Sequence, residues 1–405
     1  MGRSRGTAPC LDLDQDTPEE VVAALVDDVR RAPERRQELV ALLPERLALY
    51  AGRSTNATIR IRGWILAAFE DVGLPEAALP FVLEELESGR DAYLVAAAAK
   101  ALRGLERPAD RFVGFLFQAI ENIRYADDAL TFSTYLPAWP NAEHTTALGE
   151  ILRTFAWLGG RARSAAPGLE RLYGDPTLPS ATREAIARAL EAVRSGSGQA
   201  VAAGEGCPGA GVEIPLLEGS VPRVRHAAAV PAEVELEDQA GRRLTFGDFF
   251  RRRPTVVVFF YTRCPNPSKC SLTITKLAAL QEAIRREGLA GRLGTAAITY
   301  DPEYDLAPRL KAYGENRGVT FDERHRFLRT TGGFGAIGEY FQPNVNFGPA
   351  LVNRHAIELF ILDEGGRIAA TLSRLRWDVG QALDRVQLLL NPHGALTGPG
   401  PPPRR

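Results

Sequence analysis

The fold of the C-terminal half is decided by VVVFFYTRCPNPSKC, residues 256–270. The branched and aromatic residues at its start, bounded by charge and proline, are typical of a fully buried strand. This strand leads into a loop that carries Cys264, and Cys270 lies at the start of the helix expected next. A rigid strand end and a helix start that each deliver one sulfur are typical of a soft-metal or redox site.

Residues 17–195, by contrast, show the periodicity of amphipathic helices almost throughout. Two helical hairpins in this region are similar to each other, one between Pro80 and Leu102 and one between Pro167 and Leu190. Repeats of about forty residues would give this spacing. The pattern resembles HEAT-like helical repeats, so we expect an N-terminal all-α domain, an α-solenoid. A plain helical bundle is the alternative.

The remaining chain divides by composition. Residues 196–229 are rich in glycine and proline, which predicts a flexible linker, and residues 394–405 predict a disordered tail. Between them, residues 230–393 alternate strands and helices, which predicts an α/β thioredoxin-like domain. The expected elements are a hairpin around residues 234–246, strands at 255–262, 294–300, 357–362 and 368–372, and helices at 267–287, 306–316, from about 322, and at 379–390.

Composition excludes several classes of protein. The 405 residues are 45% hydrophobic and 24% charged, as in ordinary globular proteins, and a net charge of −1 gives no general attraction to nucleic acid or acidic lipid. Four cysteines do not make a disulfide framework. The basic N-terminus has no apolar run behind it, and no segment is long enough to span a bilayer. We therefore expect a cytoplasmic protein without a membrane partner.

A metal centre is predicted from three side chains. Asn266 and Pro267 are typical of an N-cap and a first helical residue, which would place Cys270 in the first turn, where the helix dipole favours thiolate. Cys264 would reach the same point from the strand end. His355 precedes the strand at 357–362, which we expect to lie parallel to the strand at 255–262. Two thiolates and one imidazole suit Cu(I), whereas zinc usually takes four ligands.

The same residues carry a resemblance to a known family. FYTRCP at 260–265, TYDPEYD at 299–305 and VNRHA at 352–356 together resemble the Sco/SenC copper proteins, over about residues 232–391. The resemblance implies a thioredoxin-like domain that binds copper through Cys264, Cys270 and His355. It also implies delivery of copper to cytochrome oxidase, or reduction of thiols there. Asp301 and Asp305 match a structural loop of the family and are not expected to be ligands.

This chain departs from the family pattern in two respects. The family spaces its cysteines three residues apart, whereas the longer run PNPSK lies between Cys264 and Cys270. Family members are normally exported and membrane-anchored, and no export signal is evident here. The helical half is not part of the family pattern and suggests a surface that docks a protein partner.

Three hypotheses follow. In the first, the protein is a metallochaperone that binds Cu(I) and delivers it to a partner protein docked on the helical repeats, or maintains that partner's thiols. In the second, it is an enzyme, a thiol–disulfide oxidoreductase that resembles thioredoxins or peroxiredoxins, in which Cys264 and Cys270 cycle without metal and Cys207 in the linker could resolve the disulfide. In the third, a degenerate thioredoxin fold serves as a protein-interaction scaffold.

Two further motifs are expected to carry no function. His325 lies in a charge-rich stretch, where we expect a solvated helical face. The residues GFGAIG at 333–338 fit the glycine pattern of dinucleotide sites, but the preceding residues 326–331 do not read as the strand that such a site requires.

Overall fold

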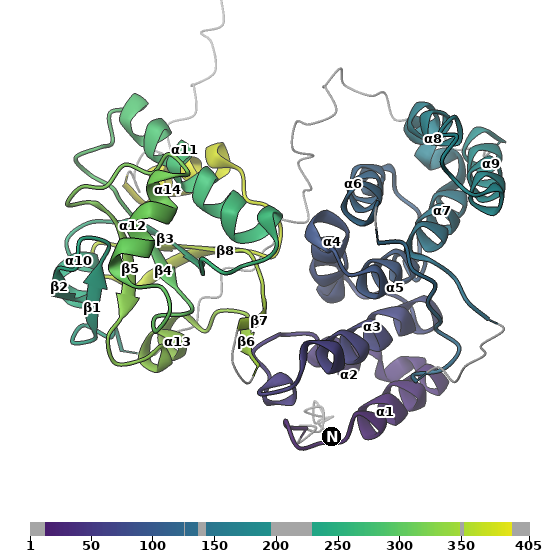
Figure 1. Ribbon diagram of the computed structural model, residues 1–405, viewed down its shortest axis with the longest axis horizontal. Helices are drawn as coiled ribbons and strands as arrows, with labels where there is room; N and C mark the ends of the chain where they lie inside the picture. Colours follow the sequence, from purple (N-terminus) through teal and green to yellow (C-terminus); the bar gives the residue numbers. More distant parts are fainter. Residues whose placement is uncertain (1–12, 125, 137–142, 196–228, 349–351, 391–405) are drawn as a thin grey trace, which may run out of the picture. The chain divides into compact units, whose positions relative to one another are not determined.

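The computed structural model describes the chain except for residues 1–12, 125, 137–142, 196–228, 349–351 and 391–405 (Figure 1). The chain divides into two compact units. We call Met1–Val212 with Val345–Arg354 the helical unit, and Glu213–Asn344 with His355–Arg405 the sheet unit. Cys10 and Cys207, nearly all of the predicted linker and the predicted tail lie outside the described residues.

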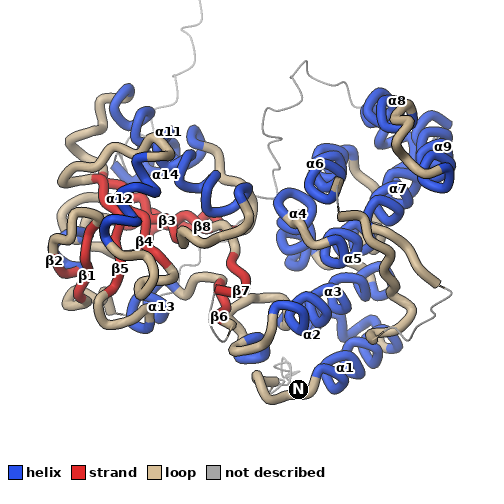
Figure 2. Tube along the Cα trace, viewed as in Figure 1, coloured by secondary structure: helices blue, strands red, loops and turns tan. Residues whose placement is uncertain are grey.

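The helical unit confirms the prediction of an all-α N-terminal region (Figure 2). Its helices are α1 (Glu19–Arg31), α2 (Arg36–Ala41), α3 (Thr55–Val72), α4 (Leu79–Ser88), α5 (Ala92–Leu102), α6 (Val113–Ile123), α7 (Ala147–Leu158), α8 (Ala166–Tyr173) and α9 (Ser180–Ser195). Helix α2 ends at Ala41, three residues before Pro44, which lacks the N–H that would continue a helix. Several helices start at a side-chain cap, for example Ser54 before α3 and Asp91 before α5.

The helices of this unit pack in succession. Helices α3, α5, α7 and α9 each contact the next, and α4 packs on both α5 and α6. Their apolar faces form a continuous core that includes Phe69 and Phe155, both fully buried. This order of packing is compatible with stacked helical hairpins, and the HEAT-like assignment stays a prediction.

A two-stranded ribbon also belongs to the helical unit, although it lies within residues 230–393 of the sequence. Strand β6 (Val345–Phe347) pairs with β7 (Val352–His355), and the unit includes the ribbon as far as Arg354. The ribbon lies beside the turn Ala48–Tyr50, where the amide of Gly52 donates to the carbonyl of Phe347 over 3.0 Å. The next residue along the chain, His355, belongs to the sheet unit.

The sheet unit confirms the predicted α/β domain. Its mixed seven-stranded sheet has the order β2-β1-β5-β4-β3-β8-β9. The strands are β1 (Glu235–Asp238), β2 (Arg243–Thr245), β3 (Thr255–Phe260), β4 (Gly294–Thr299), β5 (His325–Thr330), β8 (Glu358–Leu362) and β9 (Ile368–Ser373). The helices are α10 (Phe246–Phe250), α11 (Leu272–Arg286), α12 (Ala307–Glu315), α13 (Gly335–Phe341) and α14 (Val379–Leu390), and α11 packs on α14 (Figure 1).

The helix expected from about residue 322 is wrong, because His325–Thr330 forms strand β5 between β1 and β4. Its arginines pair with acidic side chains of β1: Arg329 pairs with Glu237 at 2.9 Å, and Arg326 lies 3.3 Å from Asp238. These cross-strand pairs allow a charge-rich stretch to be a strand. His325 is not solvated, since it is buried and its Nδ1 lies 2.9 Å from the hydroxyl of Thr295.

The expectation that residues 326–331 are not a strand is therefore wrong as well. The glycine-rich motif at 333–338 does follow a strand and leads into α13, which has only seven residues.

Candidate metal centre

The first cysteine is held by the end of strand β3. Every residue of β3 is buried, and the chain leaves the sheet at Tyr261 and Thr262. There the buried carboxylate of Asp305 accepts three hydrogen bonds. One comes from the amide of Thr262 at 3.0 Å, one from the hydroxyl of Thr299 at 2.5 Å and one from the hydroxyl of Thr262. These bonds fix the backbone two residues before Cys264. Asp305 thus positions the loop and, as expected, is not near enough to the sulfurs to be grouped with them.

The second cysteine lies in an unusual helical turn. Pro267–Ser271 form a π-helical turn ahead of α11, and the side chain of Asn266 accepts the amide of Ser268 at 2.9 Å, which confirms the predicted N-cap. A π turn contains more residues than an α turn of the same length. The longer run between the cysteines is taken up in this way, and Cys270, buried at 1% exposure, faces Cys264.

The histidine reaches the site because β8 is antiparallel to β3, which corrects the expected parallel pairing. Thr255 pairs with Leu362 and Val258 with Leu359, so the start of β8 lies beside the end of β3. His355, three residues before β8, therefore comes to the same sheet edge as Cys264. A parallel neighbour would have placed it at the opposite edge.

Two hydrogen bonds orient His355. Its Nδ1 lies 3.0 Å from the carbonyl of Ala356, and a carbonyl can only accept, so Nδ1 carries the proton. Nε2 is the ring nitrogen directed at the two sulfurs, as in a metal-ligating histidine whose other ring nitrogen donates to a carbonyl. The backbone carbonyl of His355 accepts a hydrogen bond from the ammonium of Lys269 at 2.8 Å, and Lys269 is itself buried.

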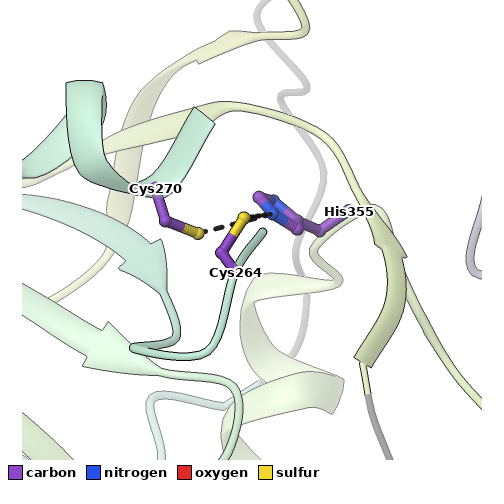
Figure 3. Close-up of side chains that lie close together, drawn as sticks. All are labelled: Cys264, Cys270 and His355. Carbon is purple, nitrogen blue, oxygen red and sulfur yellow. Dashed lines mark hydrogen bonds between the residues drawn. The ribbon is translucent and has the colours of Figure 1, made fainter. Parts of the chain in front are cut away.

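The three side chains converge (Figure 3). Nε2 of His355 lies 3.5 Å from the sulfur of Cys264 and 3.4 Å from that of Cys270, and all three atoms lie within 4.8 Å of one another. A planar three-coordinate ion with metal–sulfur distances of about 2.3 Å and a metal–nitrogen distance of about 2.0 Å needs sulfur–nitrogen separations of about 3.7 Å. The donor atoms therefore fit a soft, three-coordinate cation with small adjustments.

The two thiols differ in protonation. A hydrogen bond from Cys270, aided by His355, lowers the pKa of Cys264 from 9.0 to about 3, although burial opposes the shift. Burial and the neighbouring Cys264 raise the pKa of Cys270 well above 9.0. The thiolate of the reduced pair is therefore on Cys264. The pKa of Cys270 is raised and not lowered, against the expectation for a helix start, because the thiol is buried and lies beside Cys264.

Aromatic rings enclose the histidine. The rings of Tyr261 and Tyr300 both have centroids 5.6 Å from the imidazole, and Phe334 packs on Tyr300 at 5.7 Å. Burial, together with the charge of Cys264, raises the pKa of Tyr261. This apolar wall restricts water at the histidine while Cys264 remains partly exposed.

The structure thus brings together the three predicted site residues. Sequence reasoning missed Lys269, although the sequence offers a signal: a single lysine stands between two cysteines that otherwise enclose only proline and small polar residues. Asp301 lies at the edge of the site and holds Arg263 at 2.5 Å.

Comparisons with known proteins bear on the sheet unit. Residues 223–390 match the family model described as SCO1/SenC. This region is a SCO1/SenC family domain. Its mixed sheet with helices matches a thioredoxin-like fold. A search of curated proteins finds no match to the chain.

Several solved structures are similar to the SCO1/SenC domain. Copper-bound ScoI of Arabidopsis thaliana is 20% identical, with 41% of this chain and 100% of that one covered and a TM-score of 0.34. Copper-bound ScoI of Bradyrhizobium japonicum is 20% identical, with 40% and 99% covered and a TM-score of 0.33. Copper-bound yeast Sco1 is 20% identical, with 40% and 92% covered and a TM-score of 0.31. Among the described residues, no helix has the length and apolar character needed to cross a membrane.

Proposed function

We propose that the SCO1/SenC domain binds Cu(I) through Cys264, Cys270 and His355 and passes it to a partner protein, or keeps that partner's thiols reduced. The observation that carries the proposal is the convergence of the two cysteine sulfurs and a ring nitrogen of His355 within 4.8 Å. Soft thiolate ligands select Cu(I), and three donors satisfy it where zinc usually requires four. Copper is here a cargo, so a site that is partly open at Cys264 suits both loading and release.

The protonation states support a monovalent cargo. In the reduced site Cys264 is a thiolate and Cys270 a thiol, so binding requires the proton of Cys270 to leave. At the two sulfurs a monovalent metal ion then replaces a proton, and the net charge of the cysteine pair does not change. A divalent ion would add a positive charge beside the buried Lys269, which raises the cost of burial.

An anaerobic competition titration of the reduced protein with Cu(I) tests the proposal. We expect a single equivalent to bind, and Cys264→Ala, Cys270→Ala and His355→Ala each to weaken binding by at least about 100-fold, since changes outside the ligand set alone cost 10–100-fold. His144→Ala is the control, a histidine of the helical unit outside the converging group, and it should leave the affinity unchanged. Binding that survives all three ligand substitutions would refute the proposal.

Delivery to a partner is the second half of the proposal. We propose that the partner docks on the helical unit, and that its docking is independent of the metal ligands. Crosslinking of the full chain in cells, with and without Cys264→Ala, tests this: the same partner should be captured in both cases. Loss of capture in the variant would place docking at the metal centre instead. The cytoplasmic location expected from the sequence stays a prediction.

A second function is favoured by the unequal thiols. A thiolate at Cys264 beside a protonated Cys270 is the starting state of a dithiol–disulfide couple. On oxidation the two cysteines form a disulfide, and they pass two electrons and the remaining proton to a disulfide of the partner protein, which is reduced. A measured reduction potential in the cytosolic range, with activity in metal-free protein, would favour this enzyme over the copper protein. The scaffold hypothesis predicts instead that cysteine substitutions change neither partner binding nor any other property.

A further inference from the structure

The ribbon β6–β7 is held by side chains of the helical unit to which it belongs. The side-chain amide of Asn353 donates to the carbonyl of Arg53 at 3.3 Å and to the hydroxyl of Thr58 at 3.1 Å. The side-chain amide of Asn346 donates to the carbonyl of Tyr50 at 3.3 Å. These bonds join the ribbon to the residues just before and within the first turn of α3.

Arg354, the last residue of the ribbon in this unit, completes a buried ionic cluster. It pairs with Glu85 of α4, which lies 4.0 Å from Arg62 of α3, and Arg62 pairs with Glu45 at 2.8 Å. The exposed fractions are 15% for Arg354, 3% for Glu85, 1% for Arg62 and 2% for Glu45. Two carboxylates and two guanidiniums make the cluster neutral, and Arg354 supplies half of its positive charge. Removing Arg354 from such a cluster is costly, because it leaves a buried carboxylate with one partner fewer.

The residue that follows Arg354 is the metal-site histidine. Within the sheet unit, the chain leaves for the ribbon at Asn344 and returns at Ala356, whose amide donates to the carbonyl of Asn344 at 2.8 Å. Glu358 accepts both the amide and the side chain of Asn344, at 2.7 and 2.8 Å. His355 is thus bonded on its C-terminal side to a residue held by the sheet and on its N-terminal side to a residue held within the helical unit.

We propose that the segment Val345–Arg354 positions His355 for the metal centre, with Arg354 as a positioning residue, so that occupancy of the centre is linked to the state of the helical unit. The inference rests on the proposed function only for its copper readout. The buried ion pair restricts the backbone of Arg354, the covalent neighbour of the histidine, and by our proposal this restriction pre-organises the imidazole. Linkage is reciprocal, so a ligand at the centre must in turn stabilise the contacts of the ribbon.

The first test uses metal-free protein and therefore does not depend on copper binding. In full-length reduced protein, Arg354→Met and Asn353→Ala are compared with Arg103→Met. Arg103 is the matched control, because its pair with Glu150 in the same unit is similarly buried, at 11% and 2% exposure, and does not involve the ribbon. Nuclear magnetic resonance of the His355 side chain should show shifted or broadened signals in the two ribbon variants and unchanged signals in the control.

The second test measures Cu(I) affinity in the same variants. We expect both ribbon variants to bind about ten-fold more weakly, as for other residues that orient a metal ligand, and the control to bind as the wild type does. Conversely, Cu(I) should slow hydrogen exchange at the amide of Gly52, which donates to Phe347, by a similar factor.

The outcomes separate the two ideas. Unchanged His355 signals in both ribbon variants would overturn the inference, even if copper binds. Altered His355 signals without any copper binding would support the inference and refute the proposed function. Should Arg354→Met unfold the protein, Asn353→Ala alone decides, since it removes neutral hydrogen bonds and leaves the ionic cluster intact.

Discussion

The unequal protonation of the two cysteines predicts how each reacts with an alkylating agent. At about pH 6, a thiol with the ordinary pKa of 9.0 is about 0.1% ionised, whereas Cys264, with its pKa lowered to about 3, is almost fully ionised. This difference alone would make Cys264 about a thousandfold more reactive. A thiolate of low pKa is, however, a weaker nucleophile: with a Brønsted coefficient of about 0.45, a shift of about six pKa units costs two to three powers of ten.

The two effects nearly cancel, so the absolute rate at about pH 6 should be close to that of an ordinary cysteine and is not diagnostic. The pH dependence is diagnostic. Alkylation of Cys264 by iodoacetamide, followed by mass spectrometry of the reduced metal-free protein, should proceed at a constant rate between mildly acidic and mildly alkaline pH. Cys270 should react only after unfolding, because it is buried.

Two variants test the cause of the shift. The hydrogen bond from Cys270 is the largest contribution and His355 the next favourable one, so Cys270→Ala should restore a rate that rises with pH, and His355→Ala should restore it in part. The denatured protein serves as the reference for an ordinary thiol. A Cys264 rate in the wild type that increases tenfold per pH unit around neutrality would refute the reasoning.

Two further predictions concern residues that support the site. Asp305→Ala should destabilise the sheet unit by about 2–3 kcal/mol, because buried donors lose their acceptor, whereas Asp301→Ala, whose partner is partly exposed, should cost less than about 1 kcal/mol. Burial raises the pKa of Asp305 above 3.8, so the stability that this side chain contributes declines as pH rises through its folded-state pKa. Asp305→Ala should therefore lower the free energy of unfolding more at acidic than at neutral pH, as measured by hydrogen exchange of β3. Lys269→Met should weaken Cu(I) binding about ten-fold, because it releases the carbonyl of His355. Lys276→Met is the control, because it removes a hydrogen bond to the backbone carbonyl of Trp377 and should leave the affinity unchanged. Equal affinities of the two variants in titration would show that Lys269 does not orient the histidine.

Much of the fold could be predicted because hydrophobic period and length carry it. The continuous apolar run at residues 255–260 has no other stable place than a buried strand, and β3 occupies it. The helices of residues 17–195 follow from apolar stripes between turn residues. The site residues were predicted because thiols at a strand end and a helix start have few structural uses, and because the order of the motifs resembled a family.

What could not be predicted depends on partners distant in the sequence. Strand β5 is rich in charge, and only its pairing with Glu237 and Asp238 on β1 makes a strand of it. The hydrophobic pattern of a strand does not show in which direction it runs relative to its neighbour. The antiparallel pairing of β8 with β3 could therefore not be predicted from residues 357–362. The grouping of Val345–Arg354 with the helices rests on residues such as Glu85, far away along the chain.

Two features that set this chain apart from the Sco/SenC pattern, the longer cysteine loop and the helical half, both act on the histidine. The longer cysteine loop adds a π turn, and it contributes Lys269, whose ammonium holds the carbonyl of His355. The helical unit, absent from the family pattern, holds Arg354, the neighbour of His355. The cysteines, in contrast, are fixed by the sheet end and the turn alone. Of the three proposed ligands, His355 alone is bonded directly to a residue of the helical unit, so it is the ligand through which we expect that unit to act on the site.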